Sequence, residues 1–184
     1  MKQEEILSVC LSETSRNPIA ILEKLMSLPS CRMHGPEHHI LVGSALLTAY
    51  KNAGGEVALP AALGEMAVRG SAVPGGTCGM WGACGAGIST GQFLSIVSAS
   101  GPLAVDAWAP CIRMTACCLE NIARFGGPRC CKRDSYLALL AAAEFVRKNL
   151  NIPMETATPV CSRSSLNEQC LGEKCPFFPM EEKP

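Results

Sequence analysis

The sequence lacks an excess of charge, strand-like patterns and a nucleotide-binding glycine motif. Its 16 basic residues balance its 16 acidic ones, so no global field would attract nucleic acid or an anionic membrane. Alternating runs typical of strands are nearly absent, and no glycine-rich motif follows one, which excludes ordinary dinucleotide-binding chemistry. A length of 184 residues suits one domain with a real core.

Export and membrane signals are also missing. Residues 1–16 are acidic and helical in pattern, without the basic and apolar regions of a signal peptide. Residues 71–105 carry no charge, but Pro74, Pro102 and many glycines interrupt them, so we expect a buried helix rather than a membrane span. We therefore expect a cytoplasmic protein, in which thiols stay reduced.

Proline, glycine and capping residues divide the chain into helices. Asn17 and Pro18 are typical of a helix start, and Gly54 of a helix end. The predicted helices are 18–28, 36–55, 60–70, a central one from about residue 80, a short one after Pro102, 111–127, and 135–151 capped by Asp134 or Ser135. The predicted fold class is all-α. One domain, 1–184, holds about six helices, in N-terminal helices (1–30) and a helical core (31–152), followed by an irregular, cysteine-bearing metal-binding tail (153–184).

Small residues recur at every fourth position of the uncharged segment. On a helix they would form one stripe that lets a neighbouring helix approach closely. Since glycine costs about 1 kcal/mol relative to alanine inside a helix, the stripe indicates a packing demand, a cofactor approached by the backbone, or both. The stripe comprises Gly75, Gly79, Ala83, Gly87, Gly91, Ser95 and Ala99.

The sequence is rich in cysteine: it has twelve, grouped in close pairs and triples. In a chain without an export signal, clustered thiolates indicate a metal or redox centre rather than a disulfide framework. The strongest ligand set is Cys161, Cys170 and Cys175, because it lies in a polar tail that metal ligation would order. Pro176 after Cys175 is typical of iron–sulfur runs, although a C-x2-C spacing is missing. Zinc would suit the same thiols.

Two further cysteine sets precede or open predicted helices. Cys78 and Cys84 flank glycines that include Gly79 and Gly82, and Cys130 and Cys131 form a doublet. Helix N-termini would lower thiolate pKa values there, so Cys84, Cys130 and Cys131 are also catalytic candidates. Cations around the doublet would stabilise thiolates or an anionic cluster, or simply form a solvated helix start. These cations are Arg129, Lys132 and Arg133.

Other cysteines fit a packed core. Cys111 and Cys118 are seven residues apart and share a helix face, and Cys10 lies in an apolar run. Free cysteine packs as a small hydrophobe, so we expect Cys10 and the Cys117–Cys118 doublet to be structural.

All three histidines lie in residues 31–39, beside Cys31. His34, Glu37 and His38 match the H-x-x-E-H string of inverted zinc peptidases, but Pro36 breaks the helix that this chemistry requires. His34 should lie outside the helix and His38 in its first turn. Cys31, His34 and His38 remain further metal candidates, or else cap and pack that helix.

Four motifs in order resemble an uncharacterised cysteine-rich domain family of anaerobic bacteria and archaea. They are CRMHGPEHH, PGGTCGMWGACGAG, GGPRCCKR and the closing C…C…CP, covering residues 31–175. Family members occur alone or joined to methyltransferase-like domains. GACGAG with the later doublets is also similar to the redox-associated C-GCAxxG-C-C proteins, with Ala and Cys exchanged. The resemblance implies an anaerobe's cytosolic iron–sulfur or thiol protein in sulfur or one-carbon metabolism.

The leading hypothesis is an iron–sulfur protein with a 4Fe–4S cluster on the tail, acting in electron transfer or through a persulfide. Cys78, Cys84, Cys130 and Cys131 would form a second centre or thiol site. The alternative is a zinc-stapled interaction module for a methyltransferase, radical-SAM or other redox enzyme. A third is a corrinoid or small-molecule accessory. Whether the protein is an enzyme stays open, and a homodimer is compatible with the sequence.

Overall fold

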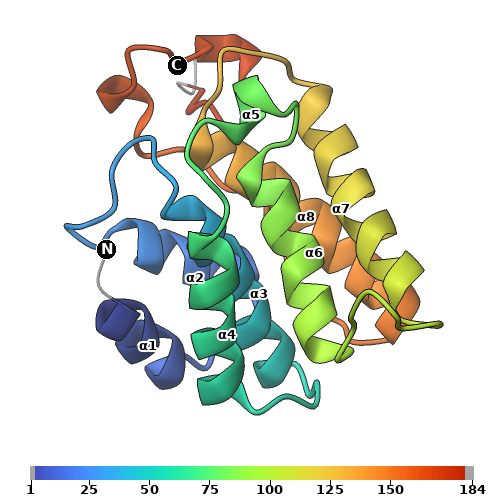
Figure 1. Ribbon diagram of the computed structural model, residues 1–184. Coiled ribbons are helices and arrows are strands. Elements are labelled where there is room, and N and C mark those ends of the chain that lie inside the picture. The colour runs from blue at the N-terminus through green and yellow to red at the C-terminus, as the bar shows by residue number, and fades with distance from the viewer. Residues whose placement is uncertain (1–2, 181–184) are drawn as a thin grey trace.

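A computed structural model describes residues 3–180, and these residues are helical with no strand (Figure 1). The predicted all-α class is confirmed, with eight α-helices in the described residues where about six were expected. They are α1 (Gln3–Ser12), α2 (Pro18–Met26), α3 (His38–Asn52), α4 (Leu59–Ser71), α5 (Thr77–Met80), α6 (Gly85–Val97), α7 (Trp108–Ala123) and α8 (Cys131–Leu150). Two short 3-10 helices, η1 (Ser164–Leu166) and η2 (Gly172–Lys174), lie in the tail. None of these helices is long and apolar enough to cross a membrane.

Helices α3, α6 and α8 form the centre of the bundle. Helix α3 packs against α2, α4, α6 and α8, and α6 also packs against α7. Most of α3 is buried, and the rings of Tyr50 and Phe93 meet edge to face with centroids 5.6 Å apart. The tail returns from the far end of α8 and covers the end of the bundle where α8 begins (Figure 1).

Local signals placed several helix boundaries correctly. Asn17 caps α2, since its Oδ1 accepts a hydrogen bond from the Ile19 N–H at 2.9 Å. Gly54 follows α3 with a φ of 98°, a left-handed conformation that favours glycine. His34 precedes α3 and His38 is its first residue, as predicted.

Three boundaries differ from the prediction. The short helix expected after Pro102 is an irregular turn. The central helix starts at Gly85, so Cys84 is its N-cap residue rather than lying one turn inside. Helix α8 starts at Cys131, because the Asp134 carboxylate accepts the Cys130 N–H at 3.3 Å and caps the helix from within its first turn.

The small-residue stripe serves helix packing along α6. A Cβ at Gly91 would lie 1.9 Å from Thr115 Oγ1, and one at Gly87 would lie 2.6 Å from Leu119 Cδ2. Both contacts are to α7, which can therefore approach α6 closely. The stripe does not continue backwards, because Gly79 belongs to the separate helix α5.

Candidate functional site

Four cysteines from two distant parts of the chain line one cavity. Cys161, Cys170 and Cys175 come from the tail, and Cys130 comes from the start of α8. Arg133 and Arg163 line the same cavity. The three predicted tail cysteines are thus brought together around one cavity, and Cys130 is the fourth cysteine that lines it.

The tail is fixed in this position by a few specific contacts. Phe177 is buried and its ring meets Tyr136 of α8 edge to face, with centroids 5.2 Å apart. The Phe177 carbonyl accepts the Cys161 N–H at 2.7 Å, which ties the two ends of the tail loop together. The chain between Cys161 and Phe177 contains the two short 3-10 helices η1 and η2. Of the apolar side chains in the tail, Met154 and Phe177 are buried, so polar contacts hold much of the segment.

Two of the cavity sulfurs accept hydrogen bonds from N–H groups. The Gly172 N–H donates to Cys170 Sγ at 3.4 Å, and Asn167 Nδ2 donates to Cys130 Sγ at 3.6 Å. Such donors stabilise thiolate and the negative charge of a thiolate-bound metal group. Asn167 is a cavity residue that sequence analysis missed, since a single asparagine in a polar tail gives no signal.

Burial opposes ionisation of two of the tail thiols, and an arginine near each one acts against it. Loss of solvent raises the pKa of Cys161 and of Cys175, while the guanidinium groups of Arg163 and Arg133, respectively, act to lower them. Arg163 is held by Glu23, with Nη1 at 2.6 Å from the carboxylate, and Tyr136 donates to the same carboxylate. A metal cation would supply the missing positive charge.

The vicinal doublet is divided between two sites. Cys131 lines a second, more open groove with Cys78, Cys84 and His39. The predicted cofactor-binding residues Gly79, Gly82, Arg129 and Arg133 also line this groove, which includes further glycines before α3, α5 and α8. The sequence predicts a second centre or thiol site of Cys78, Cys84, Cys130 and Cys131. Cys130 lines the tail cavity and the other three line the groove, and whether the four act together stays a prediction.

Three thiols near helix starts do not have the lowered pKa values that these positions suggested. Burial raises the pKa of Cys84 to about 12, and it also raises the pKa of Cys130 and Cys131. Desolvation outweighs the backbone N–H groups of the helix starts at all three sulfurs. The expectation of lowered pKa values is wrong for these catalytic candidates in this structure.

The histidines have three different environments. His34 uses both ring nitrogens, since Nε2 donates to Asn167 Oδ1 at 3.1 Å and Nδ1 accepts the Cys131 N–H at 3.4 Å. It is therefore a positioning residue for the start of α8 and the tail rather than a free ligand. His39, which the sequence analysis did not single out, donates from Nδ1 to the Val73 carbonyl at 3.1 Å and lines the groove.

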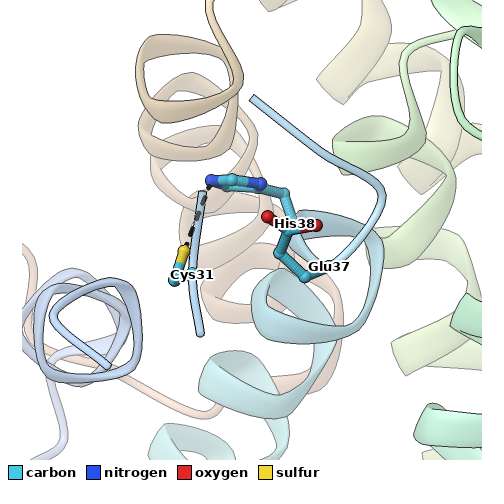
Figure 2. Close-up of side chains that lie close together, drawn as sticks. All are labelled: Cys31, Glu37 and His38. Atoms are coloured by element: carbon cyan, nitrogen blue, oxygen red, sulfur yellow. Dashed lines mark hydrogen bonds between the residues drawn. The ribbon is translucent and has the colours of Figure 1, made fainter. Parts of the chain in front are cut away.

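A third cluster contains Cys31, Glu37 and His38 (Figure 2). Among the described residues it is the one group of three such side chains whose ligand atoms all lie within 4.8 Å of one another. Both Glu37 oxygens are engaged by Arg32, with Nη2 at 2.8 Å from Oε2. Lys132, expected to bind a cofactor near the doublet, instead donates to Cys31 Sγ at 3.1 Å.

The remaining cysteines lie away from these three sites. Cys10 and Cys118 are fully buried, which confirms them as core residues, whereas Cys117 is exposed and Cys111 half-buried. None of the twelve cysteines is joined in a disulfide.

Cys117 should be an alkylation target near neutral pH. The two sulfurs lie 4.0 Å apart, and a hydrogen bond from the Cys118 thiol to the Cys117 thiolate would lower the pKa of Cys117 to about 7. A lowered pKa leaves thiolate at lower pH, so the iodoacetamide rate at Cys117 should rise between about pH 6 and 8 and then level off. Peptide mass spectrometry after timed labelling measures this. Cys118→Ala should move the rise to higher pH, and an unchanged profile would contradict the assigned hydrogen bond.

Together, the fold and the thiol sites define a class: an all-helical, cysteine-rich protein whose C-terminal tail closes onto the start of its last long helix. The sequence profile described as "Family of unknown function (DUF5714)" matches residues 6–178, and the chain belongs to that family. No curated protein and no solved structure matches the chain.

Proposed function

We propose that the protein binds a 4Fe–4S cluster on Cys130, Cys161, Cys170 and Cys175. It would use the cluster in electron transfer, or in sulfur or one-carbon metabolism. The observation that carries the proposal is that these four thiols line one cavity. Cys130 and Cys161 are 31 residues apart in the sequence, so the chain folds back to bring them together. Four cysteines are the ordinary ligand set of such a cluster.

In this structure the cavity sulfurs are not drawn together around a single ion. Four thiolates on one zinc, each at about 2.3 Å, lie roughly 3.8 Å apart. No three of the cavity sulfurs lie within 4.8 Å of one another, since the described residues contain one such group and it is elsewhere. A four-iron cube binds each sulfur to a different iron and so holds the sulfurs further apart.

The surroundings also suit an anionic cluster. Arg133 is buried beside the cavity, where its guanidinium donates to the Gly126 and Pro128 carbonyls at 2.9 and 3.0 Å. Its Nε also pairs with the buried Asp134 carboxylate at 3.1 Å, so its orientation is fixed and its charge is shared between that carboxylate and the cavity. The groove that contains Cys84 and Cys131 shares Arg133 with the cavity, so a substrate or a partner's redox group could approach the cluster there.

Anaerobic purification followed by iron and acid-labile sulfide analysis tests the proposal. We expect broad absorption near 400 nm, about four irons per chain and a sulfide-to-iron ratio of about one. Colourless protein with one zinc per chain would overturn the cluster and favour a zinc-stapled interaction module for a methyltransferase or radical-SAM partner.

A further inference from the structure

Lys132 is a buried cation whose placement the cluster proposal does not explain. Its side chain is in the first turn of α8 and the residue is 1% exposed. Its ammonium donates to Cys31 Sγ at 3.1 Å and to the Arg32 carbonyl at 3.0 Å. A buried ammonium is strongly unfavourable without a charge partner, and Cys31 is the one of these two acceptors that can become an anion.

His38 approaches the same sulfur from another side. Its Nδ1 donates to the Gly35 carbonyl at 2.9 Å, so in the neutral ring Nε2 carries the lone pair. Nε2 lies 3.9 Å from Cys31 Sγ (Figure 2), within reach of the thiol proton. Burial and the nearby Lys132 charge lower the pKa of His38 to about 4, so the ring is neutral at pH 7.

This arrangement is unfavourable for a metal ion, although three ligand-type side chains meet here. A cation bound by Cys31 would lie beside the Lys132 ammonium, and like charges repel strongly in a buried site. Glu37 is also unavailable, because Arg32 binds both of its oxygens. The cluster instead places the Cys31 sulfur between a proton acceptor, His38, and a cation, Lys132. A proton acceptor and a cation thus both contact the one sulfur atom of the cluster.

We propose that Cys31 is a nucleophilic thiol that accepts sulfane sulfur from a small hydropersulfide or polysulfide donor. The Cys31 proton moves to His38 Nε2 while Sγ attacks the terminal sulfur of the donor RS–SH. The donor S–S bond breaks, a new S–S bond forms on Cys31, and the leaving thiolate takes the proton from His38. The products are Cys31–S–SH and RSH, so no external oxidant or reductant is needed.

A small sulfur donor fits this position better than a large organic substrate. Cys31 lines neither the tail cavity nor the open groove, yet it is partly accessible. Lys132 would also stabilise the anion of the persulfide. The assignment rests on the sulfur-handling form of the proposed function, and it moves the persulfide role from Cys84, Cys130 and Cys131 to Cys31.

The test uses the full chain under anaerobic conditions with inorganic polysulfide as the probe. After brief exposure and trapping with iodoacetamide, trypsin releases residues 25–32, in which Cys31 is the one cysteine. We expect this peptide to gain one sulfur atom at least tenfold faster than the peptide carrying Cys10, which is fully buried. Sulfur gained on Cys84 or Cys131 instead of Cys31 would overturn the assignment.

Lys132→Met and Lys132→Arg form the matched pair of variants. Methionine removes the charge and keeps an apolar chain of similar length, so sulfur transfer to Cys31 should fall at least tenfold, while arginine should restore much of it. Labelling of exposed Cys117 in the same samples reports folding and should not change. An unchanged Cys31 rate in Lys132→Met would contradict the proposal. Iron content, measured in parallel, separates the two hypotheses: wild-type protein without iron that still gains sulfur on Cys31 refutes only the cluster.

Discussion

Cys130→Ser should lose the cluster, whereas Cys131→Ser should keep it. The two thiols are adjacent in sequence, but Cys130 lines the tail cavity and Cys131 lines the groove. Removing one of four ligands leaves three thiols that hold a cluster weakly, so we expect bound iron and sulfide to fall at least tenfold in Cys130→Ser. Both are measured per chain after anaerobic purification, with the absorption near 400 nm as a second readout.

The Cys131→Ser variant is the matched control for this experiment. It changes the same atom in the neighbouring residue, and its cluster content should stay within about a factor of two of the wild type. The helical circular dichroism of both variants shows whether they fold. Loss of iron in Cys131→Ser with retention in Cys130→Ser would reverse the division of the doublet between the two sites.

Removing the cluster should release the tail without unfolding the bundle. In the tail, Met154 and Phe177 are the buried apolar side chains of the described residues, so burial alone offers the segment little stabilisation. Metal ligation by three of its cysteines would supply the rest. After anaerobic treatment with a chelator and an oxidant, tryptic cleavage after Arg163 and Lys174 should become at least tenfold faster.

The helical bundle serves as the internal comparison. Its core is built mainly from helices, and the tail adds to it the side chains of Met154 and Phe177, so release of the tail should change the helical circular dichroism little. Cleavage after Arg147 and Lys148, near the end of α8, should stay slow. Equal acceleration at these positions would indicate global unfolding, and an unchanged rate at Arg163 would mean that metal does not order the tail.

Helices with strong local signals were predictable from sequence, and others were not. The start of α2 follows from Asn17 and Pro18, and the end of α3 from Gly54, because capping and left-handed backbone are local properties. The expected helix after Pro102 fails because the turn there has no apolar face to bury. Leu103 and Val105 are 95% and 89% exposed.

The candidate site was predictable in part for a similar reason. A polar tail with three cysteines indicates ligands by composition, so Cys161, Cys170 and Cys175 could be chosen from sequence. Cys130 could be chosen as a candidate from its doublet, but its place beside these three could not be foreseen, because it depends on how the tail folds back. The Cys31–Lys132 pair joins residues 101 apart, which no periodicity reveals.

The geometry at the start of α8 explains why the GGPRCCKR motif was hard to interpret from the sequence. Successive residues on a helix point about 100° apart, so adjacent side chains serve different neighbours. Cys130 faces the tail cavity, Cys131 the groove and Lys132 the Cys31 sulfur. In the sequence, a doublet flanked by cations suggests one site. On the helix, the same residues contact three different sites: the tail cavity, the groove and the Cys31 cluster.

The position of iron tests the central claim most directly. Crystals grown anaerobically and measured on both sides of the iron absorption edge give an anomalous difference map that locates iron. We expect one strong feature, resolved as four irons at sufficient resolution, inside the cavity formed by Cys130, Cys161, Cys170 and Cys175. Iron beside Cys84 and Cys131, or a single zinc in the cavity, would contradict it.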